Sequence, residues 1–428
     1  MDIIEIAEKI KDSGGNLYLV GGAIRDEIMG KPIYDKDYCV TGISSEKFTE
    51  LFSNAMKRGK FFEVFDIDGT EFALARRERK IGVGHKEFEI DTENVTIEED
   101  LARRDITINA IAKNVLTGEI IDPFNGRKDI ENKIIRATTN AFMEDPLRVY
   151  RVARFAAKTE FKIEKNTLKL MEKLKPELNT LSKERIFGEF EKALKEDKPS
   201  IFFEVLKQSN TLDVHFKEIF DLIGSLQPVE YHPEGDSYNH TMIVLDKAAE
   251  LTKDLGIRFA ALVHDIGKGI TPPSMYPHHY GHDEKGIPLV QNFGQRIGVP
   301  NKWIDYGKTA VKEHMKGGIF YKMTPAKKVN FIERVEKSKL GLHGLQIVVI
   351  ADKCSTRNTK LENIEFEKIG EECIKQINGN YIKQKYNIKE GVKFAQKLHQ
   401  ERVEWIKGWT LGTFFELWGR SLKFISEL

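Results

Sequence analysis

Two aspartates near the N-terminus, Asp35 and Asp37, stand one residue apart. The stretch from Tyr34 to Val40 has the composition of a β-strand, in which alternate side chains share one face. The two carboxylates would then lie roughly 7 Å apart along the strand. At that spacing both reach one Mg²⁺ and leave room for a second ion, as phosphoryl transfer requires. The pair therefore predicts a metal-dependent transfer reaction in which Asp35 and Asp37 are catalytic.

The acidic pair needs support from its neighbours, because about ten such spacings are expected by chance among 66 acidic residues in 428. Leu17 to Val20 is predicted to form a short strand that ends at Gly21-Gly22, and Ala23 to Met29 the helix that follows. This order places backbone N–H groups at a helix N-terminus, where triphosphate can bind. Arg25, one turn into the helix, can pair with phosphate. The alternative is a tight turn without a ligand.

A dense polar segment, LARRDITINA, spans residues 101–110. Its arginines, Asp105, Thr107 and Asn109 fit either a capped helix start or the lining of a pocket for ribose and phosphate. Sequence alone leaves both alternatives open.

The segment EDPLRVYRVARF, residues 144–155, predicts a helix with Asp145 as its N-cap and Pro146 in its first turn. The residues expected to form its buried stripe are Val149, Val152, Ala153 and Ala156. Asp145, Arg148 and Arg151 fall three apart on another face. There they could present an acceptor and donors to a base edge, or serve only as a cap and two solvated arginines.

Several of the 11 histidines gather in the second half of the chain. His264-Asp265 follows an apolar helical stretch and precedes the Gly-Lys-Gly break at residues 267–269. Imidazole and carboxylate ligands suit Mn²⁺, Ni²⁺, iron or Zn²⁺ better than Ca²⁺. A lone buried histidine is more often a core residue, and the chain has a second pair, His282-Asp283. We choose His264-Asp265 as the metal-binding pair because of its place after a buried helix.

Length and composition describe an ordinary globular protein of two to four domains, with 40% hydrophobic and 31% charged residues. No apolar run approaches the roughly 20 residues that span a bilayer, and the acidic amphipathic N-terminus does not resemble a signal peptide. The three cysteines lie far apart and favour a reducing cytoplasm. A net charge of +1 says nothing about nucleic acid, although basic clusters occur near residues 76–80, 103–104 and 148–154.

The fold class predicted is α+β, because the first 125 residues or so mix strands with helices and the remainder is helical. Glu71 to Arg77 is expected to form a third strand, with a basic loop after it. The expected domains are a head at 1–138, a helical neck and body at 139–226, a second helical domain at 227–350 and a helical tail at 351–428.

The motifs LVGGAIRD, DKD, RRDITINA and EDPLRVYRVARF, in this order and spacing, resemble those of the class II tRNA nucleotidyltransferases, the CCA-adding enzymes. The resemblance covers residues 17 to about 160. It implies a polymerase-beta-like head that adds or repairs the 3′-terminal CCA of tRNA from CTP and ATP, without a nucleic-acid template. Mg²⁺ would bind Asp35 and Asp37, and pyrophosphate would leave.

The same resemblance assigns roles to other residues. Gly22, Arg25 and Arg104 would contact the incoming ATP or CTP, while Asp145, Arg148 and Arg151 would read its base. The loop between Arg79 and Asp91 matches the flexible element needed for switching from C to A. Glu71 is a weak candidate for a third carboxylate.

The stretches HTMIVL, VHDIGKG, TPP and HHYGHDEKG resemble an HD domain, as found in the long bacterial multifunctional CCA proteins. That resemblance implies phosphatase, 2′-nucleotidase and 2′,3′-cyclic phosphodiesterase activities, with Ni²⁺ or Mn²⁺ as the metal. Its ligands would be His240, His264, Asp265 and Asp352. The alternative is a degenerate HD fold kept as scaffold.

Other functions compete with this interpretation. A poly(A) polymerase of the same superfamily shares the head but tends to carry a strongly basic tail, and a non-catalytic RNA-binding protein could use the same neck. The complete set of carboxylates and arginines favours the CCA-adding enzyme. No membrane partner is expected, and a homodimer remains open.

Overall fold

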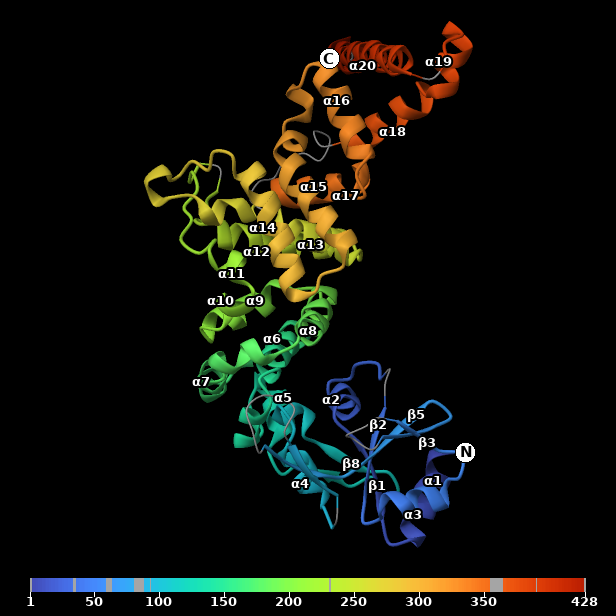
Figure 1. Cartoon of the computed structure of the whole chain (residues 1–428), viewed down its shortest axis with the longest axis vertical. Coiled ribbons are helices and arrows are strands. Elements are labelled where there is room, and N and C mark those ends of the chain that lie inside the picture. The colour runs from blue at the N-terminus through green and yellow to red at the C-terminus, as the bar shows by residue number, and fades with distance from the viewer. Residues whose placement is uncertain are drawn as a thin grey trace. The chain divides into compact units, whose positions relative to one another are not determined.

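The computed structural model describes residues 2–33, 36–58, 64–80, 88–92, 94–230, 232–354, 365–389 and 391–426. The chain divides into two compact units, residues 1–215 and 216–428, and each is described by itself. Figure 1 shows strands only in the first unit, and helices alone in the second. The predicted α+β fold class is confirmed.

A mixed sheet forms the centre of the first unit (Figure 1), and its described strands run in the order β3-β4-β5-β2-β1-β8-β9. Most neighbours are antiparallel, but β2 and β5 are parallel. The sheet strands are β1 Asn16–Val20, β2 Asp37–Thr41, β3 Met56–Arg58, β4 Val64–Ile67, β5 Thr70–Leu74, β8 Ala112–Asn114 and β9 Ile120–Ile121. Strands β6 (Arg77–Lys80) and β7 (Phe88–Asp91) pair separately as an antiparallel ribbon.

The alternation of side chains along β1 and β2 gives the sheet two buried faces. On one face Leu17 and Val40 pack beneath helices α1 (Ile3–Asp12) and α3 (Ser45–Leu51) in a core rich in phenylalanine. On the other face Tyr18, Val20 and Cys39 pack beneath α4 (Ile97–Ala102). Asp37 begins β2 two residues before Cys39, so it lies on the α4 side of the sheet.

Two expected elements differ from those observed. The strand expected over residues 71–77 ends at Leu74, and Arg77 belongs to a separate strand, β6, which pairs with β7 in the antiparallel ribbon. The helix expected to begin at Pro146, with Asp145 as its N-cap, begins at Arg148 instead, as α6 (Arg148–Thr159) with Leu147 in the N-cap position. Asp145 still accepts a hydrogen bond from the Leu147 N–H at 3.0 Å, which stabilises the turn before the helix.

The rest of the first unit is built from short elements and the helices of the neck. Helices α8 and α9 both pack against α6, whose expected stripe of Val149, Val152, Ala153 and Ala156 is fully buried. The remaining elements are α2 Gly22–Ile28, α5 Gly126–Glu131, β10 Ile134–Ile135, β11 Lys162–Ile163, α7 Lys165–Lys173, α8 Lys183–Lys195, α9 Ser200–Gln208 and α10 Leu212–His215.

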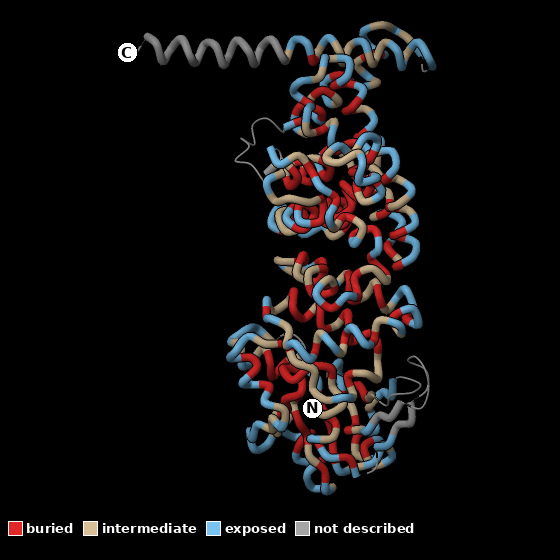
Figure 2. The backbone as a smooth tube through the Cα atoms, turned by 90° about the vertical axis from the view of Figure 1, so that its left-hand side faces the viewer, coloured by how far each residue is buried: buried red, intermediate tan, exposed pale blue. Residues whose placement is uncertain are grey.

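The second unit packs α13, α15, α16 and α17 around one apolar core. In Figure 2 the buried residues, drawn in red, gather in the interior of this helical unit and in the interior of the head. Its helices are α11 Lys217–Phe220, α12 Ser237–Leu251, α13 Leu255–Val263, α14 His282–Ile297, α15 Asn301–Gly318, α16 Pro325–Glu336, α17 Gly341–Cys354, α18 Phe366–Gln376, α19 Gly379–Tyr386 and α20 Val392–Ser426.

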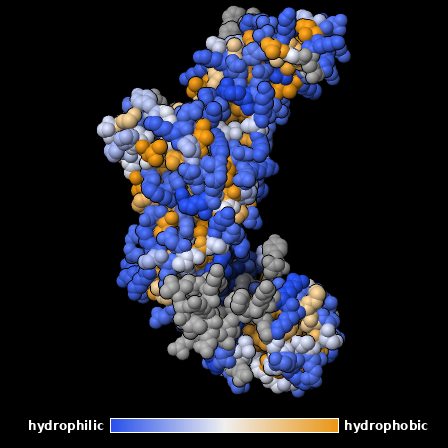
Figure 3. All heavy atoms as spheres, viewed as in Figure 1, coloured by the Kyte–Doolittle hydropathy of each residue, from blue (hydrophilic) through white to orange (hydrophobic). Residues whose placement is uncertain are grey.

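The surface drawn in Figure 3 is mostly hydrophilic, with hydrophobic residues in small scattered patches. Among the described helices, none combines the length and the apolar character that crossing a bilayer demands.

Candidate functional site

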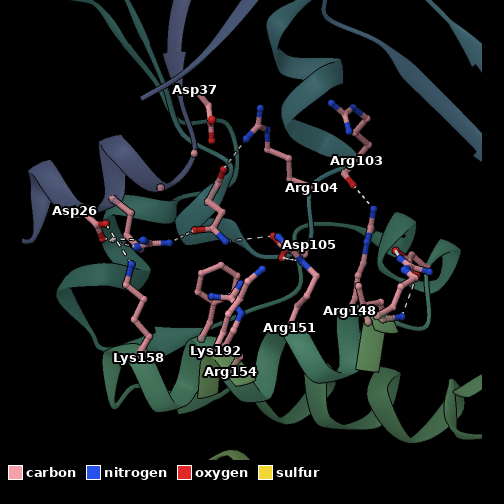
Figure 4. Close-up of a pocket in the computed structure, with 18 of the residues that line it drawn as sticks. Asp26, Asp37, Arg103, Arg104, Asp105, Arg148, Arg151, Arg154, Lys158 and Lys192 are labelled. Carbon is pink, nitrogen blue, oxygen red and sulfur yellow. Dashed lines mark hydrogen bonds and ion pairs between the residues drawn. The ribbon is translucent and has the colours of Figure 1, made fainter. Parts of the chain in front are cut away.

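The first site is a cavity of about 730 Å³ in the first unit, between the head sheet and helices α6 and α8. Figure 4 shows Asp37 and Arg104 on one side of it, with Arg148, Arg151, Arg154 and Lys158 opposite. All the predicted nucleotide-contacting residues line it, namely Gly22, Arg25, Arg104, Asp145, Arg148 and Arg151. Asp35 lies outside the described residues.

Asp37 is the described member of the acidic pair, and its side chain is exposed at the edge of the cavity. In the sheet register Asp37 lies beside Val20, the last residue of β1, and beside Glu71 on β5. The third-carboxylate candidate is therefore the direct neighbour of Asp37 on the next strand.

The junction between β1 and α2 requires glycine. Gly21 has a φ of +69°, and a Cβ there would come within 2.9 Å of an Arg104 nitrogen. The close approach of backbone and guanidinium brings Arg104 against the start of α2. Helix α2 itself has only seven residues.

Arg25 is only 2% exposed, and several contacts hold its side chain in place. Its Nη1 donates to the Asn109 side chain at 2.6 Å, its Nε donates to Asp26 at 2.9 Å, and its guanidinium lies over the Phe155 ring. Lys158 pairs with the same Asp26 at 3.4 Å. Asn109 and Asp26 therefore fix the direction of the arginine, and segment 101–110 proves to contribute to the pocket lining.

Asp100, a buried carboxylate on α4, fixes the next two arginines. Its two oxygens accept from Arg103 at 2.6 Å and from Arg104 at 3.1 Å. Burial would raise the pKa of Asp100, but the two guanidinium charges outweigh that effect and lower it. The carboxylate stays ionised and holds both arginines at the cavity.

The three residues of the expected base-reading stripe lie side by side on the cavity wall, each with a partner. Asp145 pairs with Arg185 of α8 at 2.7 Å. Arg148 is buried and donates to the carbonyl oxygens of Ala141 and Arg103, both at 2.6 Å. The Arg151 side chain, 35% exposed, pairs with Asp105 at 2.7 Å.

The pKa of Asp105 shows how strong this last ion pair is. Burial alone would raise the pKa, but the charge and hydrogen bond of Arg151 lower it to about 2. Asp105 therefore stays ionised beneath the expected base-reading stripe and holds Arg151 in place.

Sequence reasoning missed the contribution of α8. Arg185 and Lys192 both line the cavity, and neither was singled out. Their spacing of seven residues puts them on one face of a helix, which is the signal that could have found them. With them, the described cavity wall carries ten basic and four acidic side chains.

The second site is a buried cluster in the second unit. His240 (α12), His264 and Asp265 (after α13) and Asp352 (α17) converge as expected, and each is less than 10% exposed. The Nε2 of His240 lies 3.3 Å from Asp352, and the Nε2 of His264 lies 3.2 Å from Asp265. Helix α17 continues past residue 350, which is why Asp352 belongs to this cluster.

Two further histidines join the cluster. The Nε2 atoms of His282 and His314 lie 3.4 and 3.3 Å from one Asp265 oxygen. Sequence reasoning set His282 aside because it treated the second His-Asp pair as a competitor, and it did not select His314. In the structure His282 is the first residue of α14 and faces Asp265, so both pairs contribute a histidine.

The donor atoms of the cluster fit a metal ion. All four Nε2 atoms and one Asp265 oxygen are buried without a hydrogen-bond partner in the structure. The Nδ1 atoms of His264 and His314 face backbone carbonyls, which leaves Nε2 as a lone-pair donor. Nitrogen and carboxylate ligands at this density match a transition-metal site.

Electrostatics in the cluster also favour a cation. Burial would raise the pKa of Asp265, but the charges of Lys268 and His264 hold it well below its usual range. Burial alone would lower the pKa of His240, but the neighbouring carboxylates of Asp352 and Glu234 raise it to about 9. A proton on His240 occupies the position that a metal would take.

Comparisons with known proteins match separate parts of the chain to known families. Family profiles match a poly A polymerase head domain at residues 17–136, a "probable RNA and SrmB-binding site of polymerase A" at 160–223, and an HD domain at 237–357. The fold and the two sites therefore define a nucleotidyltransferase with an HD domain.

The chain is 43% identical over 346 residues to a "Multifunctional CCA protein" of Shewanella denitrificans, which covers 78% of this chain and 83% of the relative. The chain belongs to the multifunctional CCA protein family, and it is a CCA-adding tRNA nucleotidyltransferase with an HD phosphohydrolase domain. The poly(A) polymerase and the non-catalytic RNA-binding protein are thereby set aside.

Solved structures share the fold. A CCA-adding enzyme with ATP has a TM-score of 0.65 at 18% identity, and the Thermotoga maritima CCA-adding enzyme complexed with tRNA has 0.64 at 19%. Each match covers 94% of this chain and 90% of the other.

Proposed function

We propose that the cavity of the first unit binds CTP or ATP beside the 3′ end of tRNA, with Asp35 and Asp37 as ligands of Mg²⁺. The observation that carries this proposal is the strongly basic wall of the cavity with Asp37 at its edge. Basic side chains at this density neutralise a triphosphate and an RNA backbone together. Relatives of this fold were solved with ATP and with tRNA.

In the proposed reaction, the tRNA 3′-hydroxyl oxygen bonds to the α-phosphorus of the nucleotide. The bond from that phosphorus to the bridging oxygen breaks, and pyrophosphate leaves. Mg²⁺ at this site supplies charge neutralisation and lowers the pKa of the hydroxyl. Arg25 and Arg104, fixed by Asn109, Asp26 and Asp100, orient the triphosphate.

Asp145, Arg148 and Arg151 are the proposed base readers, with Gly22 allowing the nucleotide close to the backbone. Their existing partners support a preorganised template, because Arg185 and Asp105 restrain Asp145 and Arg151 before a nucleotide arrives. Glu71, the register neighbour of Asp37, remains the proposed third carboxylate.

The HD cluster is proposed to hold Ni²⁺ or Mn²⁺ through His240, His264, Asp265 and Asp352, with His282 and His314 as added ligands. Its proposed activities are phosphatase, 2′-nucleotidase and 2′,3′-cyclic phosphodiesterase. The burial and unpartnered nitrogens of the cluster support this assignment. Such hydrolysis would regenerate the 3′-hydroxyl that the first site needs on damaged tRNA.

The domain ranges 1–138, 139–226, 227–350 and 351–428 also remain a proposal. Helix α17, which carries Asp352, runs to Cys354 and so crosses the boundary at residue 350. Cys39 and Cys373 are buried free thiols, and this supports a reducing cytoplasm as the compartment.

Replacing Arg148 with alanine tests the template. We expect a changed ratio of kcat/KM for CTP and ATP, together with incorporation of UTP or GTP. The Tm should fall by a few degrees, because the carbonyls of Ala141 and Arg103 lose their donor. The measurement is single-nucleotide addition to tRNA lacking the final residues, with each nucleotide supplied separately.

The exposed Arg127 of α5 is the matched control, and its alanine variant should keep both selectivity and Tm. Unchanged selectivity in a folded Arg148→Ala protein would remove Arg148 from the template.

A further inference from the structure

The cavity in front of the HD cluster extends beyond the proposed metal ligands. It has a volume of about 500 Å³, which is in the range of small-molecule sites. Its wall also includes Gln227 and the loop of residues 277–281, none of which belongs to the metal cluster. A ligand that fills the cavity therefore contacts this wall as well as the metal.

Gln227 presents a hydrogen-bond donor that has no partner. The residue is 3% exposed, and its Oε1 accepts from the Lys268 Nζ at 2.6 Å. Lysine only donates, so the amide oxygen must face it and the Nε2 must face elsewhere. That Nε2 is buried without a partner in the structure. Because a buried donor left unpaired is destabilising and Gln227 lines the cavity, an acceptor on a bound ligand would stabilise it.

The mouth of the cavity carries a pair of stacked rings. Tyr280 is 70% exposed, and its ring stacks on that of His278 at a centroid distance of 5.6 Å and an interplanar angle of 25°. Large exposed aromatic rings beside a pocket are typical platforms for nucleobases.

The loop that bears these rings is anchored. The side chain of His279 hydrogen bonds with the Thr271 hydroxyl at 3.0 Å and the Leu226 carbonyl at 2.9 Å. The His279 carbonyl oxygen also faces the Nδ1 of His282, at 2.8 Å. The ring pair is thus fixed relative to the metal cluster through one histidine of that cluster.

We propose that this wall is a nucleoside-binding subsite for the terminal nucleotide of an RNA that carries a 2′-phosphate or a 2′,3′-cyclic phosphate. The inference rests on the proposed hydrolysis at the HD centre. The nucleobase stacks on the Tyr280–His278 pair, and the Gln227 amide donates to a ribose or phosphate oxygen. The subsite makes the HD centre selective for nucleotides over phosphate esters without a base.

The test compares two substrates of the metal-loaded full chain, adenosine 2′,3′-cyclic phosphate and methyl riboside 2′,3′-cyclic phosphate. Tyr280→Ala should lower kcat/KM for the adenosine substrate by roughly five- to a hundredfold, the range of one lost base stack, and change the other less than about twofold. Tyr280→Phe keeps the ring and should resemble wild type. Gln227→Ala should lower kcat/KM for both substrates, because its acceptor is common to them.

A binding measurement separates failure of the subsite from failure of the proposed hydrolysis. Calorimetry on metal-free protein should show that adenosine 2′-phosphate binds more tightly than methyl riboside 2′-phosphate, and that Tyr280→Ala loses the difference. This binding result supports the subsite even if wild type hydrolyses neither cyclic substrate. Failure to hydrolyse either substrate would reject only the proposed hydrolysis. Equal substrate and binding preferences in wild type and Tyr280→Ala would overturn the subsite.

Discussion

Asp37→Ala should abolish the addition of both C and A, with a loss of at least about a thousandfold in rate. The size follows from the several kcal/mol of charge stabilisation that a bound metal supplies to phosphoryl transfer. Both nucleotides fail together because the carboxylate acts on the phosphate and not on the base. The measurement is single-turnover addition of labelled CTP and ATP to matching tRNA ends.

The control for this variant is Glu119→Ala, which removes an exposed carboxylate from the same head, next to β9. It should add both nucleotides at the wild-type rate. Asp37 is exposed, so its loss leaves Tm nearly unchanged and the defect cannot be unfolding. Loss of A addition alone would contradict the assignment, since it would place Asp37 in nucleotide choice.

Asp265→Asn should remove hydrolysis at the HD centre, again by at least about a thousandfold, while CCA addition stays at the wild-type rate. Asp265 lies against Lys268, His264, His282 and His314, so neutralising it removes the only described charge that faces all of them. The bound metal should be lost with the activity. Metal content by mass spectrometry and cyclic phosphodiesterase rate are the two readouts.

The matched control is Asp305→Asn, which alters a half-buried carboxylate, 39% exposed, on α15, the helix that bears His314. It should retain both metal and hydrolysis. His264→Ala should behave like Asp265→Asn. If either cluster variant keeps full cyclic phosphodiesterase activity, the assignment of the cluster is wrong.

The architecture of the head followed from short-range patterns. The apolar run at residues 17–20 and the strand composition of residues 34–40 predicted the strands that the structure contains as β1 and β2, and the 3.6-residue period of Val149, Val152, Ala153 and Ala156 predicted the buried face of α6. Helix boundaries were less predictable. Asp145-Pro146 has the composition of a helix start, but Asp145 ends the preceding 3₁₀ turn and the helix starts two residues after Pro146.

Long-range partners were beyond sequence reasoning. Nothing in the spacing of Arg25 and Asn109, or of Arg151 and Asp105, indicates that each pair forms an ion pair or hydrogen bond across the fold. The same limit applied to His282 and His314, because only the packing of α13 against α15 and of α14 against α15 brings them to Asp265. Residue type and spacing identified the candidate site residues, but only the tertiary structure shows which of them are in contact.

The most direct test of the central claim, that one protein-lined cavity chooses and transfers both nucleotides, uses tRNA that ends before its CCA. The purified protein is incubated with CTP alone, ATP alone and both together, and the products are resolved at single-nucleotide length. The account predicts two added residues with CTP alone, none with ATP alone, and three with both, after which addition stops. Unlimited addition of A, or addition of A without prior C, would contradict it.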